Sequence, residues 1–300
     1  MARLGTKARY TLLAYLFLAP ALALLLTFVL YPVVQGFRLS FFQYDPYTQS
    51  GEYLGLANYR RMWDDPEFKV ALLNSFRYLI VVPVIIVLSL ALAVLVEPLI
   101  PGIHFFRAAY YIPVVTTMVV VGITWRFIFS EDDGLLNILL SKWGLIESAI
   151  PWMTNHRLVL ATVMMVTVWK GLGYYMVVFI AALRSIPMEL IEAAIVDGAK
   201  PRQLFWRVKL PLLWPAITLV AVISSISALQ VFDEIFVMTG GKIREAITLV
   251  YYIYETGFDA KIGPQDYGYA SAMSVMLFLI LVAFTALNLF LMRRGGYGGE

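Results

Sequence analysis

The chain has 300 residues, of which 61% are hydrophobic and only 14% charged, and its formal net charge is +3. A water-soluble protein of this length has too little interior to bury so much apolar surface. The composition therefore excludes a disordered chain, a soluble enzyme and a nucleic-acid binder. It predicts a protein whose excess apolar surface faces the lipid bilayer.

Composition also restricts the available chemistry. The chain has no cysteine, which excludes disulfides, thiolate nucleophiles and iron–sulfur clusters. The two histidines, His104 and His156, fall in connecting segments, and no H-E-x-x-H sequence occurs. The run Gly240-Gly241-Lys242 continues with Ile243, so it is not a P-loop. We expect no catalytic residue, no metal site and no cofactor in this chain.

Six apolar runs are each long enough to cross the hydrocarbon core as a helix, which predicts an all-α, polytopic membrane protein. They cover residues 11–36, 74–96, 108–129, 158–183, 211–232 and 269–291. The first run follows basic residues, as in a signal peptide, but it is too long for one, so we interpret it as a retained helix. Because no repeat or low-complexity segment divides the chain, we expect residues 1–300 to form one membrane domain.

Basic residues predict the orientation of these helices. If the N-terminus is inside, the inner loops carry Lys and Arg at about twice the density of the outer loops, as the positive-inside rule requires. The inner loops are then 1–10, 97–107, 184–210 and 292–300, and the outer loops are 37–73, 126–157 and 233–268. Both termini are therefore predicted to be cytoplasmic.

Lys170 is the charged residue that hydropathy does not explain. It lies 13 residues from Arg157 and 14 from Arg184, which places it roughly 20 Å from either end of the fourth run, near the membrane midplane. Arg77, by contrast, is close enough to the outer end of its run to reach the interface. A lysine at such depth needs a hydrated cavity or an ionic partner.

The inner connection at about 185–210 is too long for an ordinary loop between bundled helices. Pro187 followed by acidic residues predicts a helix start, and Gly198 predicts a stop in the left-handed conformation. Pro201 then predicts a second short helix. This pattern fits either a helix–turn–helix on the cytoplasmic surface or an amphipathic loop on lipid headgroups.

The spacing within this connection resembles a known signature. It reads Glu192-Ala193-Ala194, then Gly198, and, after nine intervening residues, Val208-Lys209-Leu210-Pro211. Similar short matches, such as Gly55–Tyr59 and Gly268–Ala272, extend over nearly the whole chain. On these residues the chain resembles the permease subunits of binding-protein-dependent ABC importers. Within the carbohydrate-uptake branch, it is similar to the F subunit of maltose transporters and the A subunit of glycerol-phosphate transporters.

This resemblance implies the type I importer permease fold, with a cytoplasmic coupling segment that contacts a separate ATPase. The residues that it assigns to ATPase coupling are Glu192, Ala193, Ala194, Asp197 and Gly198. It implies a second permease subunit, a dimer of ATP-binding subunits that holds ATP and Mg²⁺, and an extracytoplasmic solute-binding protein. The expected location is the cytoplasmic membrane of a bacterium or archaeon. One departure occurs where many members have Gly-Gly-Gly-Pro, because Lys242 and Ile243 take the last two places here.

The resemblance also assigns a path for the solute. Helical spacing puts Thr167, Lys170, Gly171 and Tyr174 on one face of the fourth predicted helix. The resemblance adds Ser224, Ser227 and Ala228 from the fifth, with Gln230 nearby. Serine and threonine in membrane helices also serve as packing contacts or bond to their own backbone, and Lys170 could instead pair with the second permease.

The expected solute is a sugar or oligosaccharide. Lys170 leaves open an anionic solute such as glycerol-3-phosphate, since a neutral sugar does not require a cation. A more distant alternative is a non-transport subunit of a membrane enzyme, against which the scarcity of histidine and the lack of cofactor motifs count.

Overall fold

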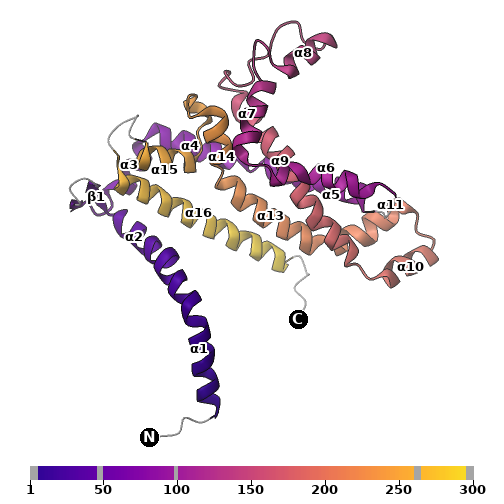
Figure 1. Ribbon diagram of the computed structural model, residues 1–300, viewed down its shortest axis with the longest axis horizontal. Coiled ribbons are helices and arrows are strands. Elements are labelled where there is room, and N and C mark those ends of the chain that lie inside the picture. The colour runs from indigo at the N-terminus through magenta and orange to yellow at the C-terminus, as the bar shows by residue number, and fades with distance from the viewer. Residues whose placement is uncertain (1–5, 46–49, 98–100, 260–264, 295–300) are drawn as a thin grey trace. The chain divides into compact units, whose positions relative to one another are not determined.

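Helices account for most of the described structure, which confirms the all-α prediction. The computed structural model (Figure 1) describes residues 6–45, 50–97, 101–259 and 265–294. The chain divides into two units, Met1–Asp64 with Ile253–Phe278 and Asp65–Tyr252 with Leu279–Glu300. We describe each unit by itself, and the expectation of one membrane domain stays a prediction.

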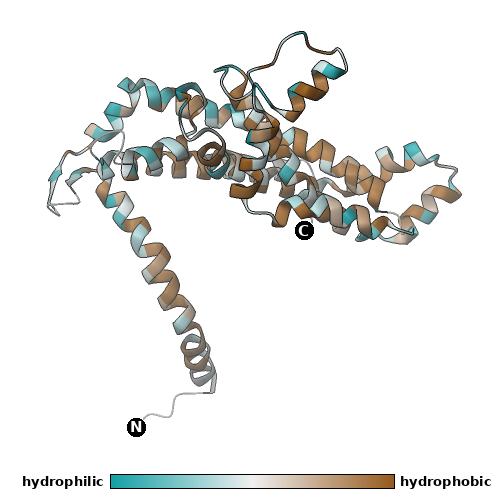
Figure 2. Cartoon of the chain, turned by 45° about the horizontal axis from the view of Figure 1, so that its top comes forward, coloured by the Kyte–Doolittle hydropathy of each residue, from teal (hydrophilic) through white to brown (hydrophobic). Residues whose placement is uncertain are grey.

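The first unit begins with a long helix whose side chains are exposed from Tyr10 to Val34. Helix α1 (Thr6–Leu25), a π-helical segment (Leu26–Leu30) and α2 (Tyr31–Leu39) follow one another without interruption. Together they give an apolar stretch from Tyr10 to Leu39, and none of its most apolar window is buried. Figure 2 shows mostly hydrophobic residues along this helix. The first predicted span is therefore a continuous helix of membrane-crossing length.

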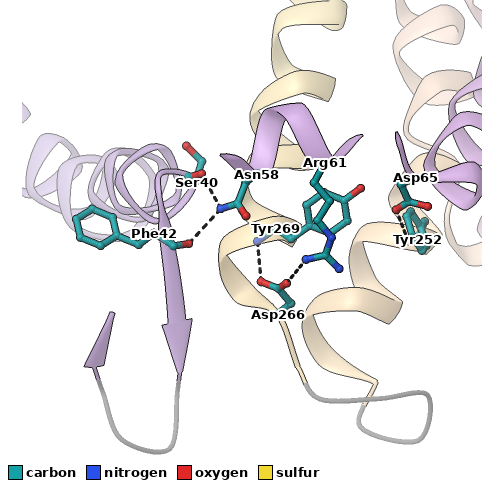
Figure 3. Close-up of polar contacts among 8 residues, drawn as sticks. All are labelled: Ser40, Phe42, Asn58, Arg61, Asp65, Tyr252, Asp266 and Tyr269. Atoms are coloured by element: carbon teal, nitrogen blue, oxygen red, sulfur yellow. Dashed lines mark hydrogen bonds and ion pairs between the residues drawn. The ribbon is translucent and has the colours of Figure 1, made fainter. Parts of the chain in front are cut away.

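Two short strands and a short helix follow in the first unit. Strands β1 (Phe42–Asp45) and β2 (Ser50–Tyr53) pair antiparallel, and α3 (Ala57–Asp64) comes next. The buried Asn58 side chain donates hydrogen bonds to the carbonyl oxygens of Ser40 and Phe42, at 3.0 and 3.1 Å (Figure 3). These bonds fix the start of the hairpin against α3.

The start of the last helix is held to α3 by charge. Helix α16 (Tyr267–Arg294) begins after Asp266, whose carboxylate accepts a bond from the Tyr269 backbone N–H as an N-cap. Arg61 donates to the same carboxylate at 2.6 Å, and its guanidinium lies 4.1 Å from the centre of the Tyr269 ring (Figure 3). One arginine thus joins two segments about 200 residues apart in the sequence.

The second unit contains most of the remaining helices. In chain order they are α4 (Pro66–Tyr78), α5 (Val81–Val96), α6 (Ile103–Val115), α7 (Met118–Ile128), α8 (Leu135–Lys142), α9 (Val159–Arg184), α10 (Met188–Val196), α11 (Pro201–Leu204), a π-helical segment (Phe205–Lys209), α12 (Leu210–Leu212), α13 (Trp214–Leu229), α14 (Asp233–Thr239) and a 3₁₀ turn (Arg244–Ala246). Helix α15 (Leu249–Phe258) begins in the second unit and ends in the first, since the division falls after Tyr252. Helix α9 packs against α5, α6, α13 and α14, and its fully buried Val163, Val166, Met176 and Phe179 belong to the apolar core.

The described part of the chain contains four helices long and apolar enough to cross a membrane, and six spans if each of two bent pairs counts as one. The predicted straight helix over 108–129 is wrong, because α6 and α7 meet at an angle of 99°. Thr116 and Thr117 have extended backbones there, three residues after Pro113, whose missing N–H weakens the helix. The predicted helix over 211–232 is likewise shorter, since α13 begins at Trp214 after a 61° bend and ends at Leu229.

Both π-helical segments of the described chain end two residues before a proline, Pro32 and Pro211. Proline cannot donate to the carbonyl four residues back, so the helix loses a bond at that point. The wider π turn accommodates this loss without breaking the helix.

Two glycines of α9, Gly171 and Gly173, differ in how closely the neighbouring helices approach them. A Cβ atom on Gly173 would lie 2.1 Å from the backbone oxygen of Tyr110 on α6, whereas one on Gly171 would lie 3.2 Å from the mobile end of the Ile85 side chain. We expect Gly173→Ala to destabilise the protein by about 1–3 kcal/mol, because backbone must move. Gly171→Ala is the matched control and should cost less than about 1 kcal/mol. Thermal unfolding of the purified protein in detergent compares them, and equal loss in both variants would contradict this packing.

Candidate functional site

A cavity of about 370 Å³, lined by both apolar and polar side chains, lies within the second unit, beside α9. Its lining comes from α5, α6, α9, α13 and α14. Seven of the eight residues predicted to line a solute path are among the lining residues: Thr167, Lys170, Gly171, Tyr174, Ser224, Ser227 and Ala228. Helical spacing for the fourth predicted helix and the family resemblance for the fifth thus selected residues that meet at one cavity.

Gln230 is the exception. Helix α13 ends at Leu229, and Gln230 takes the C-cap position with a backbone outside the helical range. Its side chain is exposed and does not line the cavity. The prediction extended the helix too far, so its spacing no longer applied at this residue.

The serine hydroxyl groups that line the cavity donate hydrogen bonds to backbone carbonyl oxygens of their own helix. Ser224 donates to the carbonyl oxygen of Val220 at 2.6 Å, and Ser227 donates to that of Ile223 at 3.0 Å. Each serine oxygen keeps its lone pairs, so both serines can only accept further bonds. The backbone contact that the sequence suggested as an alternative role is thus present, and it leaves acceptors in the cavity.

Thr167 is held in the same way from two sides. Its hydroxyl lies 3.2 Å from the carbonyl oxygen of Val163 and also bonds to the hydroxyl of Tyr78, which is fully buried. When Thr167 donates to Val163, Tyr78 is the donor to Thr167. This arrangement connects α4 to α9 at the edge of the cavity.

Lys170 and Tyr174 supply hydrogen-bond donors. Lys170 carries three N–H donors, and it forms no hydrogen bond or ion pair within the described chain. Tyr174 is 42% exposed, and its ring packs edge-on against Tyr175, with the ring centres 5.1 Å apart. A half-exposed aromatic ring beside polar groups suits an amphipathic solute.

Glu234 also lines the cavity, and the sequence reading missed it. It lies in the first turn of α14, directly after the fifth predicted span, and was counted among the charges of an outer loop. Burial raises the pKa of its carboxyl group, the charge of Asp233 adds to this, and the positive charge of Lys170 opposes it. An acidic pair directly after an apolar span was the only signal in the sequence.

Hydrogen bonds to α4 fix the loop that follows α14. The buried Asn74 side chain donates to the backbone oxygens of Glu245 and Ile247, at 2.7 and 2.9 Å. Thr248 donates to the carbonyl oxygen of Val231 at 2.9 Å, which ties the loop to the start of α14. These bonds hold in place the helix that carries Glu234.

Ion pairing and a capping residue hold the same loop at its ends. Arg244 forms a two-pronged contact with the carboxylate of Glu67. Asp65 caps α4 and also accepts a bond from the Tyr252 hydroxyl at 2.7 Å (Figure 3). The departure at Lys242 and Ile243 lies within this anchored loop, with Lys242 exposed and Ile243 against the apolar core.

The inner connection forms the predicted helix–turn–helix. Helix α10 starts after Pro187, and Gly198 has φ +81°, the left-handed conformation expected of it. Helix α11 starts at Pro201, and Figure 1 shows α10 and α11 next to each other at one end of the unit. Of the predicted coupling residues, Glu192, Ala193, Asp197 and Gly198 are exposed, and Ala194 is half-buried.

The described residues contain no group of three His, Asp or Glu side chains placed to hold a metal ion. The site consists instead of a cavity with mixed donors and acceptors and of a separate exposed helical segment. Such an arrangement can bind a polar solute and a protein surface.

Comparison with known proteins identifies the family. The model of binding-protein-dependent transport system inner membrane components matches residues 68–295. The lactose transport system permease protein LacF of Rhizobium radiobacter is 32% identical over 98% of this chain and 98% of its own. The sn-glycerol-3-phosphate transport system permease protein UgpA of Agrobacterium fabrum is 30% identical over 96% and 97%.

The fold agrees with a solved structure. A chain of the bacterial alginate ABC transporter, crystallised in complex with alginate pentasaccharide-bound periplasmic protein, superposes with a TM-score of 0.86 over 100% of both chains at 23% identity. At that identity the match shows a shared fold. The chain therefore belongs to the family of binding-protein-dependent transport system inner membrane components, as the spacing from Glu192 to Pro211 indicated.

Proposed function

We propose that this chain is the permease subunit of an ABC importer that moves a sugar or oligosaccharide across the cytoplasmic membrane of a bacterium or archaeon. The observation that carries the proposal is the cavity beside α9, which offers donors and acceptors within the matched region. Hydroxyl groups of a sugar can both donate and accept, so they complement such a lining. The relatives named for lactose and alginate transport support the same solute class.

An anionic solute such as glycerol-3-phosphate is a second candidate cargo. Lys170 lines the cavity, and a relative is named for sn-glycerol-3-phosphate. An anionic solute would pair with the lysine. Uptake of labelled lactose and of labelled glycerol-3-phosphate by cells that express the complete importer separates the two cargoes. Uptake of neither, with the complex assembled, would refute both.

The chain works with partners in this proposal. A second permease completes the path, an ATPase dimer binds ATP and Mg²⁺, and a solute-binding protein delivers the solute from outside. The exposed segment with α10 and Gly198 is the proposed contact with the ATPase. The alginate transporter solved with its periplasmic protein supports the last partner. The chain itself is not an enzyme in this scheme.

The proposed orientation is testable because the chain contains no cysteine. Lys142 and Arg202 are both exposed, and the proposal places them on opposite sides of the membrane. A membrane-impermeant maleimide should label Lys142→Cys in intact cells, and Arg202→Cys only after permeabilisation. A reporter after Glu300 should be cytoplasmic and one at Gln49 external, both positions lying outside the described residues. The reverse pattern would overturn the orientation and the coupling role together.

The coupling role of Gly198 has a matched control in Gly144. Both have positive φ, +81° and +67°, and a Cβ atom on either would meet nothing within 4 Å. We expect Gly198→Val to abolish uptake and solute-stimulated ATP hydrolysis in a protein that still inserts, because the side chain intrudes on the docking surface. Gly144→Val carries similar backbone strain, about 1–2 kcal/mol, and should retain uptake.

Glu192→Lys should also weaken ATPase docking, since it reverses the charge of an exposed residue in the same segment. Normal solute-stimulated hydrolysis in both coupling variants would remove this segment from the ATPase interface.

The role of a serine acceptor can be separated from its bond to the helix. Ser227 and Thr218 both donate to a carbonyl four residues back on α13, but only Ser227 lines the cavity. We expect Ser227→Ala to weaken solute uptake by about threefold to tenfold, the loss of one hydrogen bond of about 1 kcal/mol. Thr218→Ala should change neither uptake nor thermal stability. Equal effects of both changes would assign the Ser227 hydroxyl to the helix alone.

A further inference from the structure

We infer that Glu234 and Lys170 act together as a charge-balanced pair that makes the cavity select neutral, hydroxyl-rich solutes over anions. This inference rests on the proposed role of the cavity as the solute path. Among the residues that line the cavity, these two are the only ones with ionisable charges of opposite sign. With both ionised, the lining has no net charge.

A lysine in a membrane-spanning helix is energetically costly unless an ionic partner or a hydrated cavity receives its charge. Lys170 lies on α9 and Glu234 on α14, two helices that pack together. The anchored loop behind α14 keeps the carboxylate at the cavity. Glu234 therefore supplies, within this chain, the negative charge that Lys170 requires.

Lys170 and Glu234 do not neutralise each other through a direct ion pair. No ion pair within 4.0 Å joins Lys170 to Glu234 in the described structure, although the charge of Lys170 acts on the carboxyl group. Both groups thus keep hydrogen-bonding capacity for a solute. Charge-assisted hydrogen bonds of this kind are roughly twice as strong as neutral ones.

A solute that bonds to both Lys170 and Glu234 must offer an acceptor to one and a donor to the other. A sugar hydroxyl can accept from Lys170, and another can donate to Glu234. The oxygen of Ser224 can also accept a hydrogen bond, because its own proton is bound to the backbone, and that of Ser227 can do the same beside its bond with the Tyr175 hydroxyl. A carboxylate or phosphate oxygen has no proton to offer these acceptors, and it would meet the negative charge of Glu234. Such like-charge contacts cost several kcal/mol.

The test compares the neutral disaccharide lactose with its acid relative lactobionate. Weak binding of each probe to the purified permease–ATPase complex, without the solute-binding protein, is measured by saturation-transfer difference NMR. We expect the wild type to favour lactose. Glu234→Gln should raise the affinity for lactobionate relative to lactose by about tenfold or more, since one like charge is removed. An unchanged ratio would overturn the proposed selectivity.

Lys170→Met keeps the length of the side chain and removes the charge. We expect insertion to survive, uptake to fall and the affinity of the solute-binding protein for solute to stay the same. The double variant Lys170→Met/Glu234→Gln restores charge balance. Its loss of thermal stability should therefore be smaller than the sum of the losses in the two single variants. Lys142→Met and Glu147→Gln are matched controls at exposed sites. Strict additivity, or loss of the second permease from the Lys170→Met complex, would show that Lys170 and Glu234 are not partners.

A separate variant tests whether the solute passes through this cavity at all. Gly171→Leu would extend a side chain into the cavity from α9. If this variant transported and bound solute normally, the solute would not use the cavity, even if the two charges proved coupled. Lack of binding of either probe to the wild type, together with that result, would reject the sugar path and the selectivity with it.

Discussion

A charged group within membrane-spanning helices must be satisfied inside the protein, and the arrangement around α9 follows from this requirement. Gly173 allows α6 to approach until the Tyr110 carbonyl oxygen lies where a Cβ atom would be. Gly171, two residues earlier, points about 200° away around the helix and borders the polar cavity. One helix is thus held tightly on one side and borders, on the other, the cavity that Lys170 lines.

The cavity has more acceptors than its composition suggests. Serine and threonine usually count as both donors and acceptors, but here their protons serve carbonyl groups of α9 and α13. These bonds let polar residues sit in apolar helices at little cost. They also leave Lys170 and the hydroxyls of Tyr174 and Tyr175 as the donors of the cavity. In the proposed solute path, the same polar residues serve both helix packing and recognition of the solute.

Hydropathy was sufficient to locate the apolar helices, because burial in lipid demands long uninterrupted runs. The same reasoning failed at Thr116 and Thr117, since both halves of the bent pair are apolar and a window average does not sense direction. Local chemistry did predict the left-handed turn at Gly198 and the starts at Pro187 and Pro201. These features depend on near neighbours in sequence, whereas the bend depends on packing in three dimensions.

The candidate site was predictable only in part for a similar reason. Periodicity selects one face of one helix, so it grouped Thr167, Lys170 and Tyr174 and did the same for Ser224 and Ser227. Glu234 lies beyond the end of α13, on a short helix whose position is set by contacts of a distant loop with α4. No spacing rule connects it to Lys170, which lies 64 residues earlier. Gln230 was included because the helix was assumed to continue past Leu229.

The exposed segment around α10 differs from the cavity, because its conformation is set by residues near in sequence while few other parts of the chain cover it. Helix α10 has nine residues and none is buried, and Val196 is 86% exposed beside the exposed Ile195. A helix this short is marginal in water by itself, and apolar side chains in such positions gain stability only when another surface covers them. Gly198 is free of neighbours, so nothing in this chain forbids a side chain there except the backbone conformation. The segment is therefore preformed by its proline and glycine, and a covering surface would stabilise its exposed apolar side chains, as the proposed contact with an ATPase subunit requires.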